Sequence, residues 1–219
     1  MNKPDINKSN IVMLNDAKYL RLFDYQYAPG RHYINATRRH LDDLMVLKSE
    51  EEFKCAIPDA VTIMVVIKTP NEEPRLLLAR EYRYPAGQFL MSPPAGVIDP
   101  ADKMTDNPVL TAARRELMEE AGIEVKENDR LFVLNPLLFS TPGMTDESNA
   151  IACAVINLDD LSILSQKGAE DSELFDGFIL LTKEEAKNII KNGRDDKGFF
   201  YSVFTLIAME YFVHDRWLE

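Results

Sequence analysis

Three glutamates between residues 116 and 120 have a spacing that suits metal-ion chemistry. Glu116, Glu119 and Glu120 stand at i, i+3 and i+4, so in a helix they share one face and their carboxylates converge. Like charges so close repel unless a cation neutralises them, and hard oxygen ligands favour magnesium, with manganese as the alternative. Arg115, four residues before Glu119, can pair with it and hold its orientation. The plainer interpretation of the same charges is a solvated acidic helix surface.

The helix that must carry these glutamates is signalled at both ends. Asn107 is expected as the N-cap and Pro108 at the first helical position, while Gly122 stands just past the end. These residues predict a helix from about Pro108 to Ala121. Because its ends are signalled independently of the charges, the helix is predicted even without a metal.

The segment "RELMEEAGI", Arg115 to Ile123, resembles the second half of the Nudix box. It has the Arg-Glu pair, the aliphatic residue, the Glu-Glu pair, the glycine and the final aliphatic residue at the family's fixed positions. Gly96, in "PPAGVID", resembles the glycine that opens the box. The resemblance implies these metal ligands: Glu116 and Glu120 as the main ones, Glu119 beside them, and the backbone carbonyl of Ala95.

Two departures from the box concern its first half. Asn107 stands where the family has a glutamate, eight residues before Arg115. The loop after Gly96 is also longer than the family pattern, with ten residues between Gly96 and Asn107. Three residues of this loop are candidates to replace the missing carboxylate, and their spacing does not choose among them: Asp99, Asp102 and Asp106.

Sequence outside the box resembles the ADP-ribose pyrophosphatase branch of the family. The segment "LLLAREYRYPAGQFLMSPPAG" is similar to the strand and loop that lead into the box there, which implies that Arg83 contacts phosphate. The segment "STPGMTDES" is similar to a mobile loop that supplies a catalytic glutamate, which implies this role for Glu147. Ser92 departs from the branch, which usually has a substrate-binding glutamate at this position.

The branch also implies a homodimer in which N-terminal strands of one subunit help to form the adenosine pocket of the other. Several N-terminal side chains could stack on or hydrogen-bond to a nucleoside: Tyr25, Tyr27, Tyr33, Arg38 and Arg39. Tyr27, Arg38 and Arg39 join Arg83 as the substrate-binding candidates. Core packing or solvation is the plainer interpretation of each N-terminal residue.

The resemblance implies magnesium-dependent hydrolysis of the pyrophosphate bond of a nucleoside diphosphate derivative, first of all ADP-ribose to AMP and ribose 5-phosphate. Metal held by Glu116 and Glu120 would neutralise the phosphates, and Glu147 would deprotonate the attacking water, with Glu119 and Arg115 completing the catalytic set. One alternative is the same chemistry on another sugar nucleotide, a dinucleotide or a nucleoside triphosphate. A second is a catalytically weak, Nudix-like module that senses a ligand, which Asn107 and Ser92 favour.

The surrounding pattern predicts an α/β (α+β) fold, a Nudix-type α/β/α sandwich with a mixed sheet, preceded by a small antiparallel N-terminal β lobe. We place a dimerisation and substrate lobe at residues 1–56 and the hydrolase domain, with its C-terminal helix, at 57–219. The expected elements are a hairpin or meander over 18–40, a charged helical stretch over 41–54, strands at 60–68, 75–84, 130–139, 150–158 and 177–181, a helix begun by Thr182 and ended by Gly193, and an amphipathic helix from about Phe199 to Trp217.

Composition excludes several classes of function. A net charge of -11 opposes a broad nucleic-acid interface, although a cation and a few arginines can still hold a small anion. The longest clean apolar run, Val61 to Ile67, is too short to cross a bilayer, and the first fifteen residues lack the order of a secretory signal. Cys55 and Cys153 lie among apolar residues, which predicts buried thiols and a cytoplasmic protein.

Overall fold

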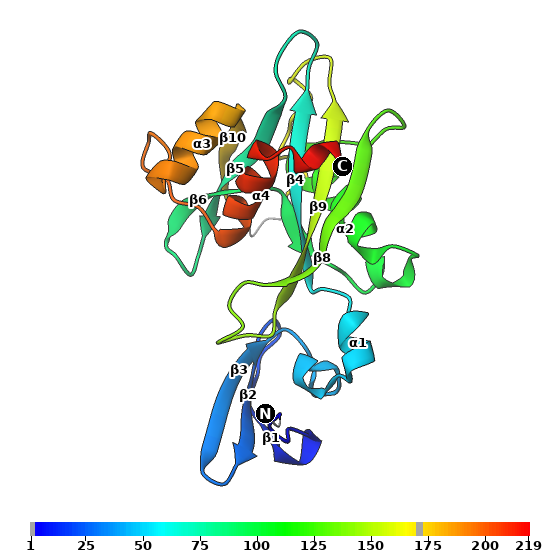
Figure 1. Ribbon diagram of the computed structural model, residues 1–219, viewed down its shortest axis with the longest axis vertical. Helices are drawn as coiled ribbons and strands as arrows, with labels where there is room; N and C mark the ends of the chain where they lie inside the picture. Colours follow the sequence, from blue (N-terminus) through cyan, green and yellow to red (C-terminus); the bar gives the residue numbers. More distant parts are fainter. Residues whose placement is uncertain (1–2, 170–172) are drawn as a thin grey trace.

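The computed structural model describes residues 3–169 and 173–219 and contains a large mixed sheet between helices, with a smaller sheet at one end (Figure 1). Its strands and α-helices, in chain order, are β1 (Ile11–Asp16), β2 (Arg21–Ala28), β3 (Arg31–Thr37), α1 (Glu50–Lys54), β4 (Ala60–Lys68), β5 (Arg75–Arg83), β6 (Gln88–Ser92), β7 (Ala95–Val97), α2 (Pro108–Ala121), β8 (Arg130–Phe139), β9 (Ser148–Asn157), β10 (Phe175–Leu181), α3 (Lys183–Asn192) and α4 (Val203–Val213). The expected α+β sandwich and the N-terminal antiparallel lobe are both confirmed.

The large sheet has the order β10-β5-β4-β9-β8. Only β4 and β9 run parallel, and the other pairs are antiparallel, so the sheet is mixed. β5 pairs with β4 only over residues 75–77 and then separates from it. β6 pairs with the later part of β5, and β7 pairs with the beginning of β4. Because of this separation, β7 lies at the beginning of β4, where it contacts α2.

Each face of the large sheet has its own hydrophobic core, because alternate residues of β4 point to opposite sides. Val61, Ile63 and Val65 pack on the α2 side, together with Leu117 of the helix. Met64 and Val66 pack on the other side, under α3 and α4. The unbroken apolar run of β4 is therefore a central strand that is covered on both faces.

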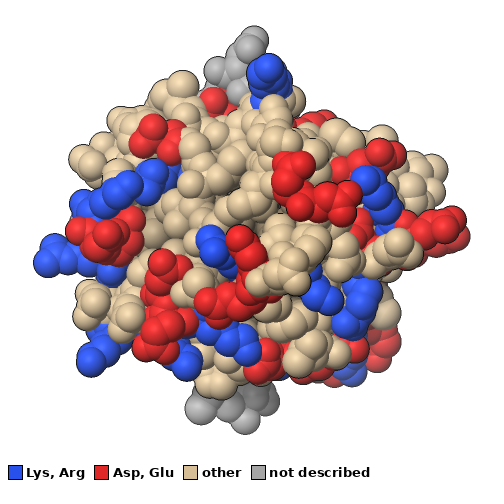
Figure 2. Space-filling model, turned by 90° about the horizontal axis from the view of Figure 1, so that it is seen from above, with Lys and Arg blue, Asp and Glu red and all other residues tan. Residues whose placement is uncertain are grey.

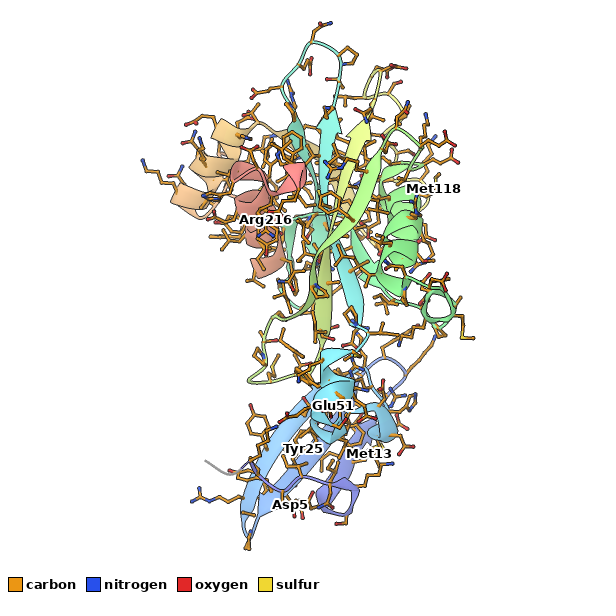
Figure 3. The ribbon with its side chains drawn as sticks, turned by 45° about the vertical axis from the view of Figure 1, so that its right-hand side comes forward. Asp5, Met13, Tyr25, Glu51, Met118 and Arg216 are labelled. Carbon is orange, nitrogen blue, oxygen red and sulfur yellow. The ribbon has the colours of Figure 1, made fainter. Side chains whose placement is uncertain are left out.

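The smaller sheet has the order β1-β2-β3 and forms the N-terminal lobe. Its core contains Phe23 and Tyr25 of β2, with Leu44 from the segment that follows β3. Figure 3 labels Tyr25 and Met13 in this lobe, which extends away from the large sheet. The β2–β3 turn lies at the far end of the lobe in Figure 1.

The structure corrects four sequence expectations. The stretch 41–54 contains two 3-10 turns and only a five-residue helix, because Ser49 caps a new start at Glu50. The last helix begins at Val203 rather than Phe199, because Phe200 and Tyr201 pair with Met91 of β6. β1 was not expected, and Cys55 is exposed, whereas Cys153 is buried.

The described residues contain no helix that is both long and apolar enough to span a membrane. On the face in Figure 2, acidic and basic side chains are interspersed, and no continuous basic patch is visible among the described residues. This distribution agrees with the net charge of -11.

Candidate active site

A cavity of about 520 Å³ lies where β6, β7 and α2 meet the loop before β9. This volume is in the range of pockets that hold nucleotide-sized ligands. Most of the sequence candidates line it, and they come from widely separated segments: Arg38, Arg83, Ala95, Arg115, Glu116, Glu119 and Glu147. Three candidates, Tyr27, Arg39 and Glu120, are not part of the lining.

Helix α2 has the predicted ends, and these set the direction of its glutamates. The Asn107 side chain accepts a hydrogen bond from Leu110 N, Pro108 is the first helical residue, and Gly122 adopts φ 68. Glu116 and Glu120 then point into the protein and are each only 6% exposed. The Glu119 side chain is 40% exposed at the cavity rim, and Met118 points outward on the solvent side of α2 (Figure 3).

Gly96 of β7 provides the space in which the Glu116 carboxylate lies. A Cβ atom at this position would stand 1.8 Å from Glu116 Oε1. Any side chain here would therefore displace the carboxylate, and this explains why a glycine opens the motif.

Glu120 lies next to the same strand, β7, where Ala95 N donates a hydrogen bond of 3.2 Å to Glu120 Oε2. Burial, and then the charges of Glu173, Glu116 and Glu81, raise the pKa of Glu120 to about 9. Burial also raises the pKa of Glu116 to about 7, although Arg115 opposes this rise. Both carboxylates thus resist ionisation until a cation shares their site.

The donor set fits a magnesium ion that keeps part of its water shell. No three His, Cys, Asp or Glu side chains within residues 3–169 and 173–219 form a ready-made metal cage. Mg²⁺, however, is commonly held by one or two carboxylates together with water and substrate phosphate. Hard oxygens of this kind are offered where α2 meets β7, by Glu116, Glu120 and the Ala95 carbonyl.

Arg115 joins α2 to the long loop after β7. It donates hydrogen bonds to Glu116 Oε1 at 2.6 Å, Glu119 Oε2 at 3.0 Å and Asp102 Oδ2 at 3.1 Å. The Asp102 side chain is only 6% exposed, whereas Asp99 is 56% exposed and 3.7 Å from Arg115. The structure therefore brings the buried Asp102 closer to Arg115 than Asp99, an arrangement that depends on how the loop folds back.

Arg39 does not occupy the position that the sequence suggested. Its side chain is 5% exposed and binds Asp59 of the sheet domain at 2.9 Å and Asp43 of the lobe at 3.0 Å. Burial in this network makes Arg39 a structural tie between lobe and domain. Tyr27 lies one residue before the end of β2 and is not among the residues that line the cavity.

The loop that carries Glu147 docks on the N-terminal lobe. Arg38 Nε donates to Glu147 Oε1 at 2.7 Å, and Tyr33 Oη donates to the Gly143 carbonyl at 2.7 Å. Ala36 N donates to the Met144 carbonyl at 3.0 Å, which continues the pairing of β3 onto this loop. Arg38 and Glu147 both line the cavity, so lobe and loop meet at the site.

Two acidic residues at the site were missed in the sequence. Glu173 lines the cavity and its charge raises the pKa of Glu116 and Glu120. Glu81 of β5 is 8% exposed and forms an ion pair of 2.5 Å with Arg83. The position of Glu173 directly before a predicted strand was a weak signal for it, and nothing local distinguished Glu81 from the other charged residues of its segment.

Comparison with known proteins gives consistent results. The NUDIX domain family matches residues 58–200, which is more than half of the chain. An uncharacterized Nudix hydrolase of Schizosaccharomyces pombe is 28% identical over 139 residues, which cover 62% of this chain and 63% of that protein. A putative nudix hydrolase 2 of Caenorhabditis elegans is 30% identical over 104 residues, which cover 48% and 42%.

The matched part is less than two thirds of either relative's length. Among solved structures, the crystal structure of an ADP compounds hydrolase covers 99% of this chain and 97% of its own, with a TM-score of 0.56 and 16% sequence identity. At that identity the likeness concerns the fold.

Proposed function

Because this chain belongs to the Nudix family, we propose that it hydrolyses the pyrophosphate bond of a nucleoside diphosphate derivative in a magnesium-dependent reaction, with ADP-ribose as the leading substrate. The observation that carries the proposal is the pair of buried carboxylates on α2, Glu116 and Glu120, of which Glu116 lines a cavity that also presents Arg38 and Arg83. Acidic groups for a cation next to basic groups for phosphate match a pyrophosphate. The name of the ADP compounds hydrolase supports the choice of an ADP derivative.

Each group of residues has a distinct part in the proposed reaction. Bound magnesium would neutralise charge on the phosphates and polarise a water molecule. Glu116, Glu120 and the Ala95 carbonyl would hold the cation, and Arg115 would keep Glu116 and Glu119 oriented. Arg83 and Arg38 would bind phosphate oxygens.

We assign the general base to Glu147, which lines the cavity on the docked loop. Its ion pair with Arg38 must open before the carboxylate can accept a proton from water. An anionic substrate that binds Arg38 would favour this opening. Glu173 is the competing candidate, because it lines the same cavity and acts electrostatically on Glu116 and Glu120.

The ligand-sensing alternative loses part of its support. Asn107 caps α2, and Asp102 binds Arg115, so Arg115 has a carboxylate partner from the loop although position 107 is not a glutamate. Ser92 remains a departure from the branch.

A substrate panel with product analysis tests the proposal. ADP-ribose, NAD, other sugar nucleotides and a nucleoside triphosphate would each be incubated with magnesium, with manganese and with a chelator. We expect metal-dependent release of AMP and ribose 5-phosphate from ADP-ribose at the highest kcat/KM. Absence of hydrolysis across the whole panel would contradict the enzyme assignment, and a better substrate elsewhere in the panel would correct only the specificity.

We also propose that the chain forms a homodimer through the N-terminal lobe. Val12 of β1 and Ile34 of β3 both pair with Asp24 of β2, so they share one sheet face, and they are 43% and 48% exposed. These two exposed apolar side chains flank Asp24 on a lobe that projects from the domain, and the face they share is our candidate for the subunit contact. In a dimer, the distal turn near Tyr27 could reach the partner's cavity.

A further inference from the structure

The unassigned side chain that reaches furthest into the proposed site is Glu81 of β5. Its side chain is 11% exposed, and its Oε2 lies 2.5 Å from Arg83 Nη2. The two residues are two apart on one strand, so they share a face of the sheet. The Arg83 side chain is 45% exposed and lines the cavity. The buried Glu81 carboxylate therefore fixes one terminal nitrogen of an arginine that lines the cavity.

Ser92 of β6 lies beside this pair. β5 and β6 are antiparallel and pair Ala79 with Ser92 and Glu81 with Leu90, so Glu81 and Ser92 are diagonal neighbours on one face. Ser92 is 3% exposed and lines the cavity, and its hydroxyl lies next to the Glu81 carboxylate, where its hydrogen bond opposes the rise that burial causes in the pKa of Glu81. Ser92 therefore supports this carboxylate from the neighbouring strand.

The position of Glu81 on β5 accounts for the small residue at position 92 on β6. A carboxylate at position 92 would stand within reach of Glu81, and two buried like charges at that distance would repel. With the carboxylate on β5, a small neutral residue on β6 avoids the repulsion and leaves the cavity open. A serine at position 92 is therefore compatible with a carboxylate at position 81, whereas a second carboxylate is not.

We propose that Glu81 is a positioning residue that orients Arg83 toward a phosphate of the substrate, and that it supplies from β5 the carboxylate that position 92 lacks. Glu81 acts through Arg83, since it does not itself line the cavity. It lowers the cost of substrate binding by holding the guanidinium in place before the ligand arrives. This inference rests on the proposed function.

Steady-state kinetics with magnesium and ADP-ribose test the proposal. We expect Glu81→Gln to raise KM about tenfold while kcat changes less than about threefold, because an interaction used for ground-state binding is lost. Arg83→Ala should raise KM at least as much, and the double variant Glu81→Gln/Arg83→Ala should be no worse than Arg83→Ala alone. Moving the carboxylate, in Glu81→Gln/Ser92→Glu, should recover most of the lost KM.

Glu72→Gln is the matched control. Glu72 lies just before β5 and pairs with Arg75, the first residue of the strand, at 3.5 Å between partly exposed groups. The variant should leave kcat and KM unchanged. Glu81→Asp keeps the charge but shortens the side chain, so an intermediate KM is expected, and it replaces Glu81→Gln if that variant does not fold. Thermal unfolding of each variant checks the fold.

Two failures can be told apart. If the wild-type protein hydrolyses nothing in the substrate panel, the proposed function is wrong. If the wild-type protein is active and Glu81→Gln keeps the wild-type KM, or if the losses of Glu81→Gln and Arg83→Ala multiply in the double variant, the role of Glu81 is overturned.

Discussion

At the residue scale, the site depends on carboxylates that are placed where water cannot screen them. Glu116 and Glu120 are nearly fully buried, and neighbouring acidic groups add to the cost of charging them. A bound cation would stabilise the ionised carboxylates strongly, because little water is present to screen the attraction between them.

Replacing one of these ligands should remove most of the activity. We expect Glu120→Gln to lower kcat by more than about a hundredfold while the protein remains folded, because metal stabilisation contributes several kcal/mol to the barrier. Glu124→Gln, just past the helix and exposed, is the control with unchanged turnover. Normal activity of Glu120→Gln at saturating magnesium would remove the metal assignment.

The same carboxylates predict how stability depends on pH. Burial raises the pKa of Glu116 to about 7 and that of Glu120 to about 9, from an ordinary 4.5. The folded state therefore retains protons that the unfolded state releases, and its stability falls as the pH rises through this interval. Thermal melts of metal-free protein should show Tm decreasing from about pH 5 to about pH 9.

Magnesium should offset this loss most strongly at high pH, since metal binding needs ionised ligands. Glu120→Gln should flatten the pH dependence of Tm and reduce the effect of magnesium. A Tm that stays level or rises across this range in the metal-free wild-type protein would contradict the burial argument.

The identity of the general base is a further question at the residue scale. We expect Glu147→Gln to lower kcat about a hundredfold with little change in KM, because an amide hydrogen-bonds to water but accepts no proton. Glu173→Gln, made in parallel, should lose less. The reverse order of the two losses would assign the base to Glu173.

At the scale of elements, the site is assembled from three segments that meet at one end of the large sheet. α2 brings the glutamates, the loop after β7 returns Asp102 to Arg115, and the loop before β9 docks on β3. Arg39 fixes the lobe through Asp59, whose carboxylate also accepts hydrogen bonds from Ser148 at the start of β9.

Two adjacent arginines should therefore respond in opposite ways. Arg39→Ala leaves the buried Asp59 without its partner, and we expect a loss of about 3 kcal/mol or more in the free energy of unfolding, measured by urea denaturation. Arg38→Ala removes an ion pair between partly exposed groups, so stability should change by less than about 1 kcal/mol while KM rises. Similar stability losses in both variants would contradict the structural role of Arg39.

At the scale of the whole molecule, the N-terminal lobe projects from the domain (Figure 1). Its sheet carries the exposed apolar side chains of Val12 and Ile34. We expect sedimentation at micromolar concentration to give a dimer, and Ile34→Lys to shift it toward the monomer without changing the circular dichroism spectrum. A wild-type monomer would contradict the dimer. A dimer that Ile34→Lys does not weaken would place the interface elsewhere.

Several features could be predicted from the sequence because their causes act within a few residues. Asn107, Pro108 and Gly122 mark the ends of α2 through hydrogen bonds and backbone angles of one turn, and helical spacing then directs Glu116 and Glu120 to one side. Alternation and apolar runs likewise identified β4, β5, β8 and β9 within one or two residues of their bounds.

Other features depend on contacts between segments far apart in the chain, and only the tertiary structure decides them. Asp102 lies buried and closer to Arg115 than the exposed Asp99, because the loop after β7 folds back and buries one of two similar carboxylates. Arg39 is buried while Arg38 is not, because Asp59 lies twenty residues later on the adjoining domain. Glu81 belongs to the site because β6 places Ser92 beside it, and spacing along one strand carries no information about the strand that will lie next to it.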